Sequence, residues 1–182
     1  MRADAKRNRD RILTAAIEAF ATEGLSVPVH EIARRAGVGT GTVSRHFPTK
    51  ESLYDAIILH RLEQLVDRAR SLAEAEEPST AFFEFFKYMA DAGATDHGLA
   101  DALGGGGYDV AASAERTGYD VMGGMRDLLT AAQRAGAVRD DVDVVDVKAL
   151  MTGCLARERG ATDAAARSRM IEIVCTGLRA HR

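Results

Sequence analysis

The chain has 182 residues, 46% of them hydrophobic and 28% charged, with a formal net charge of −3. No apolar run approaches the ~18–20 residues that a membrane span needs, and no apolar signal core follows the basic N-terminus. We therefore expect a cytoplasmic protein with no membrane partner. Three prolines and no tryptophan, in a chain rich in Ala, Leu, Arg and Glu, favour an all-α fold.

The net charge conceals an asymmetry along the chain. Residues 1–50 hold nine Lys/Arg against five Asp/Glu, which gives them +4 and leaves −7 for residues 51–182. A polyanion would be attracted to the first part and repelled by the second. A chance imbalance is the alternative reading of the composition.

The first predicted helix covers residues 8–24. Its apolar side chains share one stripe at helical spacing: Ile12, Leu13, Ala16, Ile17 and Phe20. Residues 1–6 before it are expected to form a mobile basic arm. Arg7 and Arg9 are spaced to meet DNA phosphates or a minor groove, with a solvated tail as the alternative.

Two short helices follow, joined by a tight turn. The first opens at Pro28, because proline at the first helical position has no N–H to leave unpaired. Its apolar stripe comprises Ile32, Ala33 and Ala36. Gly37 then occupies the place where a left-handed residue ends a helix. The second helix, residues 40–46, offers Val43 and Phe47 to the same core, as in a helix-turn-helix.

The outward face of the second short helix is short-chained, polar and basic, which suits a DNA major groove. The predicted contacts on it are Thr40, Gly41, Thr42, Ser44, Arg45 and His46. Thr49 is expected to cap the next helix and Lys50 to lie at its start, where main-chain N–H groups and a cation bind phosphate. A helical hairpin that only packs is the alternative.

This arrangement resembles the TetR family of transcriptional regulators over about the first 55 residues. The residues that carry the resemblance are Arg11-Ile12-Leu13, Ala15-Ala16, Phe20, Gly24, Ile32-Ala33, Ala36-Gly37-Val38, Gly41-Thr42, His46-Phe47 and Lys50-Glu51-Ser52-Leu53. The resemblance implies a homodimer whose recognition helices, about one DNA turn (~34–36 Å) apart, read a palindromic operator. It also implies release of the operator by a small-molecule effector bound in the C-terminal part.

Two positions depart from the family pattern. Val27 and Pro28 stand where members usually place a Thr or Ser that caps the helix and touches phosphate. Ser44 stands where a tyrosine that reaches the DNA backbone is common. These substitutions affect individual phosphate contacts rather than the binding mode.

Apolar spacing predicts a long helix over residues 51–75 and an aromatic-rich helix over residues 81–92. Apolar side chains on more than one face of the second imply that other helices surround it. It forms either the wall of an effector cavity or simply the centre of the core. The candidate cavity residues, three of them from a later segment, are Phe82, Phe85, Phe86, Met89, Tyr119, Met122 and Met125.

A short helix is predicted over residues 95–103, followed by a flexible loop at glycines 104–107. Another helix is expected over residues 110–135, ended by Gly136. Gly123 and Gly124 should weaken or kink the middle of that helix, at ~1 kcal/mol per glycine relative to alanine.

Asp143 is positioned to cap the first of the last two helices, and Thr162 or Asp163 to start the second. In the TetR family the corresponding helices pair with their copies in a four-helix bundle, whereas composition alone also allows an internal core. The candidate dimer-interface residues are Val147, Leu150, Met151, Cys154, Ile171, Val174 and Leu178. Cys154 and Cys175 fit no metal spacing and are interpreted as buried small hydrophobes, with a redox-sensing pair as the alternative.

Signatures of enzymes are incomplete. His30-Glu31 begins an HExxH pattern that lacks its second histidine. Gly37, Gly39 and Gly41 alternate as in dinucleotide-binding loops, but they follow a helix rather than a strand. We therefore predict no enzymatic activity, no cofactor and no metal site.

These patterns together predict an all-α regulator with two domains. Residues 1–52 form a helix-turn-helix DNA-binding domain, and residues 53–182 form a helical effector-binding and dimerisation domain. The predicted protein is a homodimeric repressor whose partners are double-stranded operator DNA and a small-molecule effector. An activator with the same DNA-binding head is one alternative. A ligand-sensing protein without DNA binding is the other, given Val27, Pro28 and Ser44.

Overall fold

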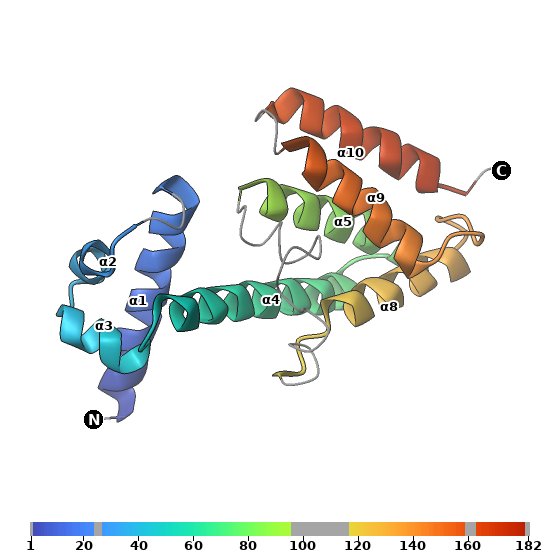
Figure 1. The fold of residues 1–182 in the computed structure, drawn as a ribbon. Coiled ribbons are helices and arrows are strands. Elements are labelled where there is room, and N and C mark those ends of the chain that lie inside the picture. Colours follow the sequence, from blue (N-terminus) through green and yellow to red (C-terminus); the bar gives the residue numbers. More distant parts are fainter. Residues whose placement is uncertain (1, 24–26, 96–116, 159–162, 181–182) are drawn as a thin grey trace. The chain divides into compact units, whose positions relative to one another are not determined.

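The computed structural model describes residues 2–23, 27–95, 117–158 and 163–180. In this part of the chain the secondary structure is helical, with no strand, which confirms the predicted all-α fold (Figure 1). The helices are α1 (Arg2–Glu23), α2 (Val29–Ala36), α3 (Thr40–His46), α4 (Lys50–Ala75), α5 (Pro78–Thr95), α8 (Val121–Arg134), α9 (Val144–Glu158) and α10 (Ala164–Leu178). None of these described helices is long and apolar enough to cross a membrane.

Two compact units, Met1–His60 and Arg61–Arg182, divide the chain within α4. The predicted division lies earlier, between residues 52 and 53. The short helix over residues 95–103, the glycine loop at 104–107 and the first part of the helix expected over 110–135 lie outside the described residues.

The first unit packs α1 against α2 and α3 around an apolar core. Ile12, Ile32 and Leu53 are almost completely buried there, and each such burial contributes about 1.5–3 kcal/mol. Val43 and Phe47 join them, as the sequence predicts. The second short helix is therefore held by its apolar side, and its polar side remains outward.

The structure corrects the prediction of a mobile N-terminal arm. Residues 2–6, expected to be mobile, are the first turns of α1. Asp4 and Arg7 form an ion pair one helical turn apart, and the Asp4 carboxylate lies where the helix dipole favours an acid. Both effects extend the helix toward the N-terminus, so Arg7 and Arg9 project from a helix rather than from a tail.

In the second unit, α5 packs against α8 and α9, and α10 packs against α9 and α5. Phe82, Phe85 and Phe86 of α5 are fully buried, together with Met89 and Met125. The aromatic helix is thus the centre of this core, which is one of the two alternatives that its composition left open.

The beginning of α8 differs from the prediction. The helix begins at Val121, because Asp120 accepts a 2.7 Å hydrogen bond from the Gly123 N–H and caps it. Gly123 and Gly124 therefore lie in the first turn, and the expected mid-helix kink is wrong. At the other end, Gly136 has φ 68°, the left-handed conformation expected of a residue that ends a helix.

The predicted Asp143 cap is confirmed, and of the two residues predicted to start the last helix it is Asp163 that caps it. The Asp143 side chain accepts from the Val145 and Asp146 N–H groups, and the Asp163 side chain accepts from those of Ala165 and Ala166. Cys154 on α9 and Cys175 on α10 are free and buried. Burial raises the pKa of both thiols, which lowers their thiolate fraction.

Candidate nucleic-acid interface

The turn between α2 and α3 holds the two helices in a fixed arrangement. Gly37 ends α2 in the left-handed region, with φ 63° and ψ 39°. Its N–H donates to the Arg34 carbonyl at 3.1 Å, and the Val38 N–H donates to the Ala33 carbonyl at 3.0 Å. These two bonds satisfy carbonyls that would otherwise be unpaired at the end of α2.

Arg11 supports the turn from α1, a role that the sequence analysis did not assign. Its guanidinium donates to the Gly37 carbonyl at 3.4 Å. A Cβ atom at position 37 would lie 2.5 Å from an Arg11 Nη atom. The positive φ therefore favours glycine at this position, and a larger residue would also make the end of the Arg11 side chain shift.

The predicted contact residues of α3 keep the outward orientation expected of them. Thr40, Gly41, Ser44 and Arg45 are exposed, and Thr42 and His46 are half-buried. Arg45 Nε donates to the Gly41 carbonyl at 3.1 Å, which fixes the base of its side chain along the helix. This surface is polar, short-chained and cationic.

Cations from α1 and α4 are held on aromatic rings of the same unit. The guanidinium carbon of Arg9 lies 5.4 Å from the centre of the Phe47 ring, directly after α3. Lys50 Nζ lies 5.9 Å from the centre of the Phe20 ring. Such contacts contribute about 0.5–1 kcal/mol each at exposed sites, and they restrict where the two charges lie.

Thr49 is engaged within the chain. Its hydroxyl accepts from the Ser52 N–H at 3.1 Å, while Ser52 Oγ accepts from the Thr49 N–H at 3.2 Å. This reciprocal pair caps α4, as predicted. Hydrogen bonds from its own backbone N–H and from Thr49 lower the pKa of Glu51. The Thr49 hydroxyl is thus already used by two neighbours.

Two further arginines are neutralised internally. Arg34 donates to the Glu31 carboxylate through Nε at 2.8 Å and Nη2 at 2.6 Å, and Arg35 Nε donates to it at 2.8 Å. Arg35 also pairs with Glu23 at the end of α1. The hydrogen bonds from Arg34 and Arg35 lower the pKa of Glu31 to about 2. The three- and four-residue spacing is the signal that could have identified this cluster.

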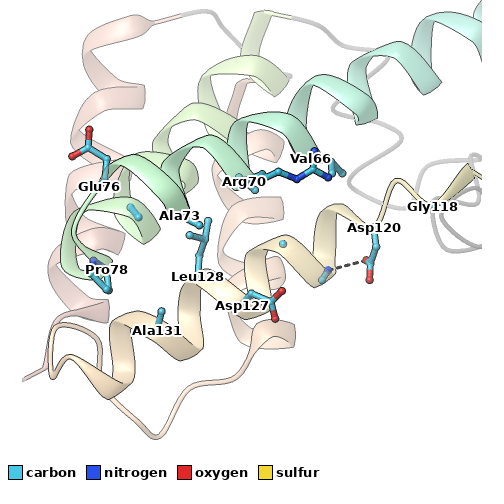
Figure 2. Close-up of a pocket in the computed structure, with 14 residues that line it drawn as sticks. Val66, Arg70, Ala73, Glu76, Pro78, Gly118, Asp120, Asp127, Leu128 and Ala131 are labelled. Carbon is cyan, nitrogen blue, oxygen red and sulfur yellow. Dashed lines mark hydrogen bonds between the residues drawn. The ribbon is translucent and has the colours of Figure 1, made fainter.

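In the second unit, a groove of about 430 Å³ lies along α4 and α8 (Figure 2). Its lining consists of Val66, Ala69, Arg70, Ala73, Glu76, Pro78, Ala81, Gly118, Asp120, Gly123, Gly124, Asp127, Leu128 and Ala131. None of the seven cavity residues expected from the sequence belongs to this lining. Tyr119 and Met122 are half-buried, and the other five are packed in the core. An effector cavity around these seven residues stays a prediction.

The candidate dimer residues are mostly covered within the single chain. Five of the seven are buried there: Val147, Met151, Cys154, Ile171 and Leu178. Leu150 is exposed and Val174 is half-buried. The large apolar side chains that α9 and α10 expose most are instead Val145, at 67%, and Ile173, at 72%.

Comparison with known proteins identifies the chain. The model for bacterial regulatory proteins of the tetR family matches residues 12–57. A second model, the C-terminal domain of SbtR-like transcriptional regulators, matches residues 77–180. A crystal structure of a TetR transcription regulatory protein from Mycobacterium vanbaalenii is 46% identical, covers 98% of both chains and has a TM-score of 0.75. The chain belongs to the TetR family of transcriptional regulators.

Other TetR-family proteins agree with this assignment. A regulator from Streptomyces coelicolor is 31% identical over 96% of this chain and 99% of its own, with a TM-score of 0.73. The transcriptional regulator UidR of Escherichia coli is 36% identical over 92 residues, which are 50% of this chain and 43% of UidR. The match thus spans less than half of that relative. These proteins are all transcriptional regulators, in agreement with the prediction that this TetR-family chain is not an enzyme.

Proposed function

We propose that the chain is a homodimeric repressor that binds a palindromic operator and releases it when a small-molecule effector binds. The proposal rests chiefly on the surface of α3. Its apolar side is buried, and Thr40, Gly41, Ser44 and Arg45 are exposed together. Side chains of this length reach base edges in a major groove, and the methyl group of a threonine can meet that of thymine.

Phosphate contacts would come from the cations around α3. Arg9 and Lys50 are positioned on the Phe47 and Phe20 rings, and Arg7 lies two residues before Arg9 on α1. At Thr49 the contact would come through the start of α4 rather than through the hydroxyl, which binds Ser52 and Glu51. A repressor with this head works in the cytoplasm, where bacterial operator DNA is found.

Dimerisation would use the outer faces of α9 and α10. Val145 and Ile173 are large apolar side chains that the single chain leaves exposed to solvent. A Cβ atom placed at Gly153 or Gly177 would have no neighbouring atom within 4 Å. A second copy could approach closely over these glycines and cover the two apolar side chains. Leu150 and Val174, from the set expected on sequence grounds, would contribute at the edge.

In vitro selection of bound duplexes from a random pool tests the proposal. We expect an inverted repeat whose half-sites are about one helical turn apart, bound with an affinity that falls steeply with salt. The selected sequence should overlap the promoter of a gene that is expressed more strongly when the chain is deleted. A selection that yields no enriched sequence at low salt would contradict DNA recognition, and lower expression after deletion would contradict repression.

A further inference from the structure

The groove of the second unit has the size of a small-molecule site, and its lining indicates which kind of ligand it accepts. It is bounded by the second half of α4, the first turns of α5 and the length of α8 from Gly123 to Ala131 (Figure 2). A volume of about 430 Å³ lies within the range of small-molecule sites, about 300–1,000 Å³. All of its described lining residues belong to one compact unit.

The floor of the groove is apolar and made of small side chains. Its apolar lining includes Val66 and Ala69 of α4 and Leu128 and Ala131 of α8. The helices approach closely, because a Cβ atom at Gly124 would lie only 3.1 Å from the Ala69 Cβ. The small residues at the contact between α4 and α8 leave space on either side of it. A hydrocarbon or aromatic group that filled this space would be removed from water, which is favourable.

The charged groups that line the groove are mostly acidic. Glu76, Asp120 and Asp127 contribute three carboxylates, against the single guanidinium of Arg70. Arg70 already has a carboxylate partner outside the lining, since its Nη1 lies 3.4 Å from Asp67 Oδ1. Asp120 accepts from the Gly123 N–H, so Glu76 and Asp127 are the carboxylates that a ligand would meet.

We propose that this groove binds an amphipathic organic cation. The apolar part of the ligand would lie on Val66, Leu128 and Ala131, and its ammonium or similar group would lie beside Asp127, with Glu76 adding negative charge at the end of α4. A monoanion of the same shape would be repelled by these two carboxylates. Near a protein surface, two unit charges at contact distance attract or repel each other by several kcal/mol, so the sign of the ligand's charge matters. Charge thus selects among ligands that the apolar floor accepts equally.

The regulatory consequence of this site rests on the proposed function. Gly118 and Asp120 of the lining flank Tyr119, whose hydroxyl donates to Glu63 of α4 at 2.8 Å. A ligand bound against Gly118 and Asp120 would shift the backbone at Tyr119 and so alter the bond between Tyr119 and Glu63. Binding of the cation and its effect on DNA are separate measurements, so failure of one does not hide the other.

Three probes with one apolar body test the ligand class. They are 4-phenylbutylamine, which is a cation at pH 7, 4-phenylbutyrate, which is an anion, and neutral 4-phenylbutanol. Amide chemical shifts of the full-length protein, without DNA, report the binding of each. We expect the amine to bind with a dissociation constant on the order of millimolar, typical of a small fragment, and at least about tenfold more tightly than the butyrate. The shifts should centre on α4 and α8.

Substitutions then locate the site. Glu76→Gln combined with Asp127→Asn should remove most of the preference for the amine over the butanol. Asp140→Asn, an exposed acid outside the groove, should leave that preference unchanged. Ala73→Phe, at an exposed position of the lining, should weaken all three probes by filling the groove. Circular dichroism confirms that each variant is folded.

Equal affinity for amine and butyrate, or no binding of the amine to the folded protein, would overturn the proposal. So would amine binding that survives both the double substitution and Ala73→Phe. If the amine binds as expected and operator affinity does not change, the site stands and effector release through it is excluded.

Discussion

The Tyr119 hydroxyl donates a 2.8 Å hydrogen bond to the Glu63 carboxylate, across 56 residues of sequence. It joins the segment before α8 to α4, the helix in which the two compact units divide. The bond is partly buried, so it is less screened than the helix-surface ion pairs of this chain.

We expect Tyr119→Phe to lower the free energy of unfolding by about 1 kcal/mol, because the Glu63 carboxylate loses a donor. Urea denaturation followed by circular dichroism measures this difference. Tyr88→Phe is the matched control, since Tyr88 is 37% exposed and its ring contact with Arg68 survives the loss of the hydroxyl. Equal destabilisation by both changes would show that the Tyr119–Glu63 bond has no particular role.

The same bond predicts a pH dependence. The hydrogen bond to Glu63, followed by burial, raises the pKa of Tyr119 above the usual 10.0. A group whose pKa is higher in the folded state stabilises the fold fully below its unfolded value and loses this contribution as pH rises through the folded value. The stability difference between wild type and Tyr119→Phe should therefore be constant near neutral pH and shrink above pH 10. A difference that grows there would contradict the assignment.

Glu31 predicts the opposite dependence at acid pH. Arg34 and Arg35 lower its pKa from 4.5 to about 2, so its contribution is present above 4.5 and is lost as pH falls toward 2. Glu31→Gln should be less stable than wild type at pH 7 and equal to it near pH 2. Asp55→Asn, an exposed acid of the same unit, is the control. Thermal unfolding across this pH range measures both, and parallel curves for wild type and Glu31→Gln would exclude the effect.

Two glycines of the helix-turn-helix predict opposite changes in stability. Gly37→Ala should lower the free energy of unfolding by about 1–2 kcal/mol, because alanine is strained at φ 63° and its Cβ would displace Arg11. Gly41→Ala has open space around it and should raise the free energy by about 0.5 kcal/mol through helix propensity. Because Gly41 is exposed on α3, the same change should weaken operator binding. A Gly41→Ala protein that binds the operator like wild type would remove position 41 from the interface.

Lys50→Ala tests the phosphate contact. The affinity for DNA should fall by a similar factor for every sequence tested, operator or not. The slope of log affinity against log salt concentration should flatten by about 0.9. Arg126→Ala removes the same charge at an exposed position of α8, outside the proposed DNA and dimer surfaces, and should leave the slope unaltered. Filter binding at several salt concentrations measures the slope. Equal slopes for Lys50→Ala and wild type would refute the contact.

Ile173→Glu tests the dimer face. The side chain is 72% exposed, so the single chain should fold normally. In the proposed dimer the new carboxylate would enter an apolar contact, and the dimer dissociation constant should rise at least about tenfold. Light scattering after size exclusion measures the mass, with the exposed Thr80→Glu as control. A dimer of unchanged stability would place the interface elsewhere.

Elements whose cause is local can be predicted from the order of the residues alone. Gly37 after Ala36 ends α2, Thr49 begins α4, and Asp143 and Asp163 begin α9 and α10. Each depends on groups within four residues of one another, so spacing along the chain is sufficient to predict them. The extent of α1 is harder to predict, because the basic first residues favour a mobile arm while the local Asp4–Arg7 pair favours a helix.

What the apolar stripes face depends on how the helices pack, which their sequences do not reveal. Helical periodicity places Val147, Met151 and Ile171 on a stripe, but the same pattern arises whether the stripe meets its own chain or a copy. Packing of α9 and α10 on α5 covers these side chains and exposes Val145 and Ile173. The groove has the same kind of origin, because Ala69 and Gly124 are distant in sequence and meet only when α4 and α8 cross.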